Sequence, residues 1–236
     1  EFELGDWVGR GGVEEFYNDH LSGQAGGKWI EVGAQGKILR ELGRKDAQSG
    51  DDLTLTIDKK WQQSAYKALS KKGKGAVIIL NPDNGEGLSL VSYPSFNPNV
   101  FTKDQDNNQI SKWLKGDDLV MMDRAISGAY HPGSTFKMIT AIAGLEEGEI
   151  DASKEAEDTG VLRVGEWEYA NWYWTQYGRK DGMVNLTKAI RRSNDIYFYK
   201  VGEWVGVNNL VKWMKKFNLG KKTGMDLPGE VSGFVP

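Results

Sequence analysis

The sequence predicts a mixed α/β (α+β) fold that combines helices with strands paired as hairpins. Three observations predict it. A nearly continuous apolar run, GAVIIL, is followed by the turn-forming NPDNGEG and then by a second β-rich run, LSLVS, which is the pattern of a hairpin. A run with one apolar helical face follows Asp58, and another follows Ser134.

Composition and charge are those of a soluble globular chain. The 236 residues are 39% hydrophobic and 27% charged, enough for one large domain or one and a half with a buried core. Thirty Lys and Arg against 33 Asp and Glu, with the signs interspersed, argue against a nucleic-acid surface. The chain has no cysteine, and His20 and His131 lie far apart in it, so we expect no disulfide, no metal site of thiolates or histidines, and no cysteine nucleophile.

Residues 1–50 predict a small α+β unit that packs on something else. GGVEEFYNDHLSG has helical spacing, and KWIEVGAQGKIL predicts two short strands around residues 33–36. The polar stretch GRKDAQSGDD indicates a boundary. The chain begins at Glu1 without methionine and has neither a signal peptide nor an apolar run of the ~18 residues that a membrane span needs. We therefore expect it to be a piece of a longer protein.

Within residues 51–109 we expect a strand, a helix, the hairpin and a loop, in that order. Leu53 to Ile57 alternate apolar and polar residues as a half-buried strand does, and Asp58 is the expected N-cap of the helix that follows. GAVIIL is apolar enough to be central in a sheet. YPSFNPNVF and KDQDNNQ predict a loop, in which Ser95-Phe96-Asn97 is a turn.

The stretch YHPGSTFKMITAIAGLEEG predicts a helix that starts at Ser134 and stops at Gly148. The Ser134 hydroxyl would lie beside unpaired N–H groups at the positive end of the helix dipole, with Lys137 one turn on. Burial that lowers a lysine pKa from ~10.4 would let Lys137 act as the base for a serine nucleophile. The alternative is a capping serine and a solvated lysine. Ser64 and Lys67 have the same spacing within a helix, and we interpret that pair as surface residues.

The order of motifs resembles the transpeptidase domain of class B penicillin-binding proteins, most closely the type-2 group associated with cell elongation. The resemblance covers nearly the whole chain and is carried by LTID, GAVIILNPDNGEGLSLVSYPSFNPNVF, RAISGAYHPGSTFK, NLTKAIRRSNDIYFYKVG and LGKKTGMDLPGEVSG. It implies the penicillin-binding transpeptidase fold, a mainly antiparallel sheet flanked by helices, with a helical subdomain. Residues 1–50 resemble the end of the non-catalytic pedestal or dimerisation-type module, and residues 51–236 resemble the N-terminal part of the transpeptidase domain.

The resemblance implies a role for each residue of two motifs. Ser134 would be the acylated nucleophile and Lys137 its base. The family's Ser-x-Asn motif corresponds to Ser193-Asn194-Asp195, where Ser193 would relay a proton toward the leaving group. An ionised Asp195 accepts hydrogen bonds and cannot donate them, which changes how it would hold Lys137 or substrate. The alternative for Ser193 is the N-cap of the following helix.

Two further residues, Thr135 and Asn194, are the substrate-binding candidates that the same motifs imply. Asn194 is expected to be more structural than catalytic.

The family's third motif, Lys-Ser/Thr-Gly on a strand edge, is spelled by Lys222-Thr223-Gly224. Pro228 follows too soon for an edge that holds an extended peptide, so we interpret this copy as a decoy. The true motif would then lie beyond Pro236, and the 236-residue piece alone would be inactive.

The segment GEWEYANWYWTQYGRKDG is rich in Trp and Tyr. Packing of the helical subdomain is the expected role of this aromatic segment, with part of it rimming the substrate cleft. A stacking platform for sugars or bases is the alternative.

The function that the resemblance implies is that of a peptidoglycan D,D-transpeptidase without metal or cofactor. Its partners would be stem peptides ending in D-Ala-D-Ala, β-lactams and a membrane glycan polymerase, and its location the outer side of the cell membrane, with an anchor upstream of Glu1. Two rivals stay open: a serine β-lactamase or β-lactam sensor, and a non-catalytic scaffold or inactive fragment, for which Asp195 and the missing third motif argue.

Overall fold

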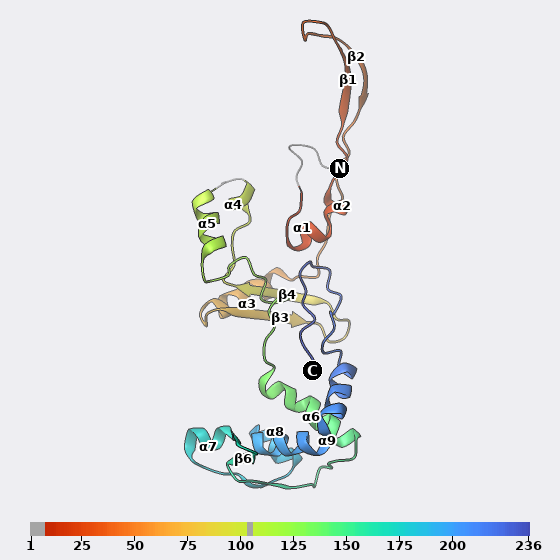
Figure 1. The fold of residues 1–236 in the computed structure, drawn as a ribbon. Helices are drawn as coiled ribbons and strands as arrows, with labels where there is room; N and C mark the ends of the chain where they lie inside the picture. The colour runs from red at the N-terminus through yellow and green to blue at the C-terminus, as the bar shows by residue number, and fades with distance from the viewer. Residues whose placement is uncertain (1–7, 103–105) are drawn as a thin grey trace. The chain divides into compact units, whose positions relative to one another are not determined.

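The computed structural model describes residues 8–102 and 106–236, whose elements Figure 1 shows. The chain forms two compact units, the first made of the residues up to 128 together with 224–231, the second of residues 129–223 and 232–236. All four strand pairs formed by the described residues are antiparallel, which confirms the mixed helix and antiparallel-strand class.

The described part of the first unit starts with two short helices, where the sequence predicted one helical stretch, and with the predicted hairpin. The helices are α1 (Gly12–Phe16) and α2 (Asn18–Leu21), and β1 (Gly27–Val32) pairs with β2 (Ile38–Lys45). Figure 1 draws this hairpin as a two-stranded ribbon in red-brown. Its large apolar side chains remain exposed: Trp29, Ile30, Val32, Ile38, Leu39 and Leu42.

The same unit contains the predicted helix and second hairpin. Helix α3 (Lys59–Ser70) has Asp58 as its N-cap, whose carboxylate accepts the N–H groups of Lys60 and Trp61. The helix packs on β4 (Gly87–Tyr93). Strand β4 pairs with β3 (Gly75–Leu80), so the hairpin prediction is confirmed. The prediction that β3 is central is wrong, because β4 is its only partner among the described residues and Ile78 and Leu80 stay exposed.

Two local predictions in this unit are wrong. Residues 53–57 form no strand, since an alternating pattern needs a neighbouring ladder and here only isolated bonds reach β4, such as Thr56 Oγ1 to the Gly87 carbonyl at 2.7 Å. The predicted loop contains α4 (Asn99–Thr102) and the start of α5 (Asn107–Lys115). Asp106 caps α5 by accepting two backbone N–H groups. Residues 103–105 of that loop lie outside the described residues.

The second unit is mainly helical and carries two small sheets. Its elements are η1 (Gly133–Phe136), α6 (Lys137–Glu146), β5 (Ala156–Asp158), β6 (Val161–Val164), β7 (Trp167–Ala170), α7 (Trp172–Tyr177), β8 (Gly182–Val184), α8 (Leu186–Arg192) and α9 (Asp195–Lys216). Strand β5 pairs with β8, and β6 pairs with β7. Helix α9 is kinked at Gly206, whose φ of 74° and ψ of 157° are not helical.

The core of the second unit lies where α6 and α9 pack together. Ala143, Val201 and Val205 are buried there. Gly144 permits the close approach, because a Cβ at this position would lie 2.9 Å from Ile150 and Val201 side-chain atoms. Each helix begins beside one of the two predicted catalytic motifs, so this packing fixes the distance between them.

Candidate active site

Ser134 lies in a one-turn 3-10 helix that continues into α6. Gly133, with φ of 56°, starts this turn after Pro132, and Thr135 Oγ1 donates to the Pro132 carbonyl at 2.5 Å. The prediction of a helix start at Ser134 is therefore confirmed, with a tighter first turn than an α-helix has. Ser134 is exposed, whereas the following turn of α6 is partly buried. A reagent can thus reach the Ser134 hydroxyl.

A hydrogen-bonded chain links Ser134 to Lys137 through Ser193. Ser193 Oγ lies 2.9 Å from Ser134 Oγ, and Lys137 Nζ lies 3.1 Å from Ser193 Oγ and 2.7 Å from the Ser193 carbonyl oxygen. Within the described part of the chain, no direct hydrogen bond joins Ser134 Oγ to Lys137 Nζ. Sequence reasoning anticipated a lysine held directly against the serine, and the structure places the Ser193 hydroxyl between them.

Lys137 forms an ion pair with Asp195. The distance from Lys137 Nζ to Asp195 Oδ1 is 2.5 Å, and the two side chains are only 15% and 19% exposed. The second carboxylate oxygen, Asp195 Oδ2, accepts the Trp172 backbone N–H at 2.9 Å. Asp195 thus accepts from Lys137 and from the Trp172 N–H, and both members of the ion pair are largely shielded from water.

The Ser193-Asn194-Asp195 motif forms the junction between α8 and α9. Ser193 ends α8 in the left-handed conformation, with φ of 50° and ψ of 42°. Asn194, not Ser193, caps α9, because its Oδ1 accepts the Tyr197 N–H at 2.9 Å, so the alternative of a capping Ser193 is wrong. Asn194 is fully buried. Its assignment to substrate binding, like that of Thr135, stays a prediction.

A buried carboxylate that sequence reasoning missed supports this junction. Asp158 is 2% exposed and accepts four hydrogen bonds, from Gly160 N (2.7 Å), Asn171 Nδ2 (2.7 Å), Asn194 Nδ2 (2.9 Å) and Asp181 N (2.9 Å). Burial alone raises the pKa of Asp158, but these donors outweigh it and hold the pKa below its usual value of 3.8. The ionised form of Asp158 is therefore the one that the fold stabilises.

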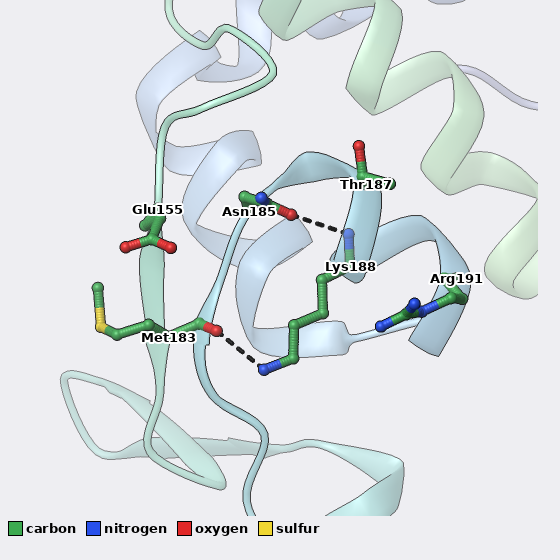
Figure 2. Close-up of a pocket in the computed structure, with 6 residues that line it drawn as sticks. All are labelled: Glu155, Met183, Asn185, Thr187, Lys188 and Arg191. Atoms are coloured by element: carbon green, nitrogen blue, oxygen red, sulfur yellow. Dashed lines mark hydrogen bonds between the residues drawn. The ribbon is translucent and has the colours of Figure 1, made fainter.

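A hollow of about 310 Å³ lies elsewhere in the second unit, between α8 and the β5–β8 pair. Figure 2 shows its lining of Glu155, Met183, Asn185, Thr187, Lys188 and Arg191. The Lys188 amine donates to the carbonyl oxygens of Asp181 and Met183, so it is already engaged as a donor. None of the four predicted catalytic residues lines this hollow.

Two other stretches match the family motifs in sequence, but among the described residues neither forms a hydrogen-bonded chain like that from Ser134 to Lys137. Ser64 and Lys67 lie on α3 and are exposed, as predicted. Residues 222–224 form no strand, which agrees with the interpretation of Lys222-Thr223-Gly224 as a decoy.

The packing prediction for the aromatic segment is correct only in part. Trp172 is partly buried, and its Nε1 donates to the Arg192 carbonyl at 2.9 Å. The Arg192 guanidinium lies 4.4 Å from the Tyr173 ring centre. Trp167 and Tyr177, however, are 73% and 63% exposed. These two side chains do not pack in the core: Trp167 lies on β7, whose partner among the described residues is β6 alone, and Tyr177 ends α7. That part of the segment rims a substrate cleft stays a prediction.

Comparison with known families gives two matches. The penicillin binding protein transpeptidase domain matches residues 75–236, and the penicillin-binding protein dimerisation domain matches residues 1–55. A curated relative, the peptidoglycan D,D-transpeptidase MrdA of Acinetobacter baumannii, is 38% identical over 97% of this chain and 34% of its own length. The chain thus spans about a third of the length of that relative.

Solved structures of similar proteins share the fold. The complex between PBP2 and MreC from Helicobacter pylori matches with a TM-score of 0.82 and 32% identity, over 97% of this chain and 42% of that one. A chain of a peptidoglycan synthase complex, described as coordinating polymerization and crosslinking, matches with a TM-score of 0.80 and 29% identity, over 94% and 41%. Among the described residues, no helix has the length and apolarity to cross a bilayer.

Proposed function

This chain belongs to the penicillin-binding protein transpeptidase family, and on that premise we propose that it is part of a peptidoglycan D,D-transpeptidase with Ser134 as nucleophile. The observation that carries the proposal is the chain of hydrogen bonds from Ser134 Oγ through Ser193 Oγ to Lys137 Nζ. An exposed hydroxyl connected in this way to a shielded amine is the arrangement that nucleophilic catalysis requires. β-Lactamase and sensor functions are not favoured by the matched families.

In the first half-reaction, Ser134 Oγ attacks the carbonyl carbon between two terminal D-alanines of a stem peptide. The Ser134 proton passes to Ser193 Oγ while the Ser193 proton passes to Lys137 Nζ, which requires both hydroxyls to rotate from the orientation in which Ser193 donates to Ser134. When the tetrahedral intermediate collapses, the proton returns by the same path to the leaving amine. D-Alanine departs, and an ester to Ser134 remains.

In the second half-reaction, an amine of a neighbouring stem peptide attacks this ester and restores the Ser134 hydroxyl. Both tetrahedral intermediates carry an oxyanion. We expect the N–H of Ser134 to donate to it, because the first N–H groups of a helix have no partner within that helix. The chemistry needs only acyl and proton transfer.

Lys137 must hand over a proton before it can act as a base. Asp195 is its nearest carboxylate, at 2.5 Å, and is itself held by the Trp172 N–H. We assign to Asp195 the role of holding the Lys137 amine beside the Ser193 hydroxyl through this ion pair. A carboxylate forms an ion pair with the ammonium, whereas a neutral asparagine at this position would form only a hydrogen bond.

Acylation by a fluorescent penicillin tests the nucleophile. The full-length protein is incubated with the reagent, denatured and run on a gel. We expect a label that survives denaturation in the wild type and is absent from Ser134→Ala. Ser64→Ala is the matched control, because Ser64 has the same spacing to a lysine yet lies exposed on α3. A stable label on Ser134→Ala would contradict the assignment.

The wider setting of the reaction is also a proposal. Because one matching structure is a peptidoglycan synthase complex, we propose that the full-length protein works with a membrane glycan polymerase at the outer side of the cell membrane. Residues 1–50 would be the end of the pedestal module and residues 51–236 part of the catalytic domain, with the third motif supplied after Pro236. The anchor would lie upstream of Glu1.

A further inference from the structure

The buried Asp158 carboxylate is the centre of a polar network that connects three separate segments. Its Oδ2 accepts from Asn171 just before α7, from Asn194 in the predicted catalytic motif, and from the Asp181 N–H just before β8. Its Oδ1 accepts from Gly160 in the turn that follows β5. Four donors thus converge on two oxygen atoms that are nearly inaccessible to solvent.

This network reaches the reacting groups in two short steps. Through Asn194, it fixes the residue that follows Ser193 and caps α9. Through Asn171, whose Oδ1 accepts the Asp195 N–H at 3.2 Å, it fixes the backbone of the residue paired with Lys137. Ser193 itself has a left-handed backbone that a side chain rarely adopts, so the junction needs support from outside.

We propose that Asp158 is a positioning residue of the transpeptidase reaction, which holds the Ser193 hydroxyl between Ser134 and Lys137. The inference rests on the proposed function. Asp158 does not touch Ser134, Ser193 or Lys137 and takes no proton in the reaction. It acts through Asn171 and Asn194. The Nδ2 of each asparagine donates to Asp158, and the Oδ1 accepts a backbone N–H, that of Asp195 for Asn171 and that of Tyr197 for Asn194.

The substitution that separates this role from simple packing is Asp158→Asn. Asparagine has nearly the same shape, but it offers one acceptor oxygen and places an NH₂ group against donors. The junction should shift, and a displacement on the order of 1 Å lowers catalysis by roughly 100-fold. Asp151→Asn is the matched control, because Asp151 also accepts backbone N–H groups, from Ser153 and Lys154, but contacts no part of the junction.

The test measures penicillin acylation of the full-length protein by stopped flow at several reagent concentrations, together with the final number of labels per chain. For Asp158→Asn we expect a maximal acylation rate about 10- to 100-fold lower, full labelling at the end, and a half-saturating concentration within about threefold of the wild type. Asp151→Asn should keep the wild-type rate. Loss of folding alone would instead lower the number of labels and leave the rate of the labelled molecules unchanged.

An acylation rate of Asp158→Asn within about twofold of Asp151→Asn would overturn the inference. If Asp158→Asn does not fold, Asn171→Ala decides by the same criteria, because it removes the link between Asp158 and the Asp195 N–H and leaves the other donors of Asp158 in place. The proposed function is checked separately. A wild type that takes no label refutes the function, whereas a labelled wild type with an unaffected Asp158→Asn refutes only the positioning role.

Discussion

Replacing Ser193 by glycine tests the proposed proton path most directly. Ser193 has φ of 50° and ψ of 42°, a region in which glycine avoids a strain of about 1 to 2 kcal/mol that a side chain incurs. The variant should therefore fold at least as well as the wild type. What it loses is the hydroxyl, and with it the 2.9 Å contact to Ser134 and the 3.1 Å contact from Lys137.

The size of the effect follows from those two contacts. They form the described hydrogen-bonded route between the nucleophile and Lys137, and general base catalysis contributes about 100- to 10,000-fold to a rate. Ser193→Gly should lower the acylation rate by that factor, which corresponds to a barrier raised by about 3 to 5 kcal/mol. Ser193→Ala should lose the rate equally but keep the backbone strain.

The assay is the time course of fluorescent penicillin labelling of the full-length protein, with urea unfolding as the measure of stability. Ser95→Ala is the control, because Ser95 belongs to a competing Ser-x-Asn sequence and donates a weak 3.4 Å hydrogen bond to the Tyr66 hydroxyl. Ser193→Gly labelling within about threefold of the wild-type rate would refute the path through Ser193.

Three further outcomes are expected. Asp195→Asn should slow acylation, since the neutral amide loses the ion pair that holds Lys137, and a wild-type rate in the labelling assay would contradict this. Gly144→Ala should lower the free energy of unfolding by about 1 to 2 kcal/mol because its Cβ meets Ile150 and Val201, whereas Gly202→Ala, with only a 3.8 Å contact, should be neutral or stabilising in urea titrations. The lowered pKa of Asp158 means that its ionised form stabilises the fold above its ordinary pKa of 3.8 and that this contribution is lost as pH falls through the lowered value. The stability difference between wild type and Asp158→Asn should therefore be largest at neutral pH and shrink below about pH 4, and a constant difference would count against it.

The sequence predicted the elements that have strong local signals. Asp58 is an N-cap followed by a helix, and Asn84-Gly85 lies between two strands that pair, because capping and turn chemistry act over a few residues. The alternation of apolar and polar side chains in residues 53–57 led to a wrong strand prediction. A strand needs a neighbouring strand to pair with, and the periodicity of one segment does not show whether such a neighbour exists. Asp106 carried a capping signal for α5 that the surrounding polar residues obscured.

The sequence could predict which residues form the candidate site, but not which hydrogen bonds connect them. The motifs identify Ser134, Lys137, Ser193 and Asp195, and the structure brings these four side chains together. That Ser193 bridges the other serine and the lysine depends on the angle between two helices, which spacing along the chain does not determine. Asp158 was missed because its partners lie 2, 13, 23 and 36 residues away, and a buried carboxylate is defined by such partners.

The close approach of α6 and α9 at Gly144 has a consequence for how such a site evolves. The two hydroxyl-bearing turns lie at the beginnings of these helices, and buried aliphatic side chains where the helices meet set the gap between them. Selection on reactivity toward an inhibitor can therefore act through these buried side chains, which the inhibitor need not contact. A survey confined to the contact residues would overlook such substitutions.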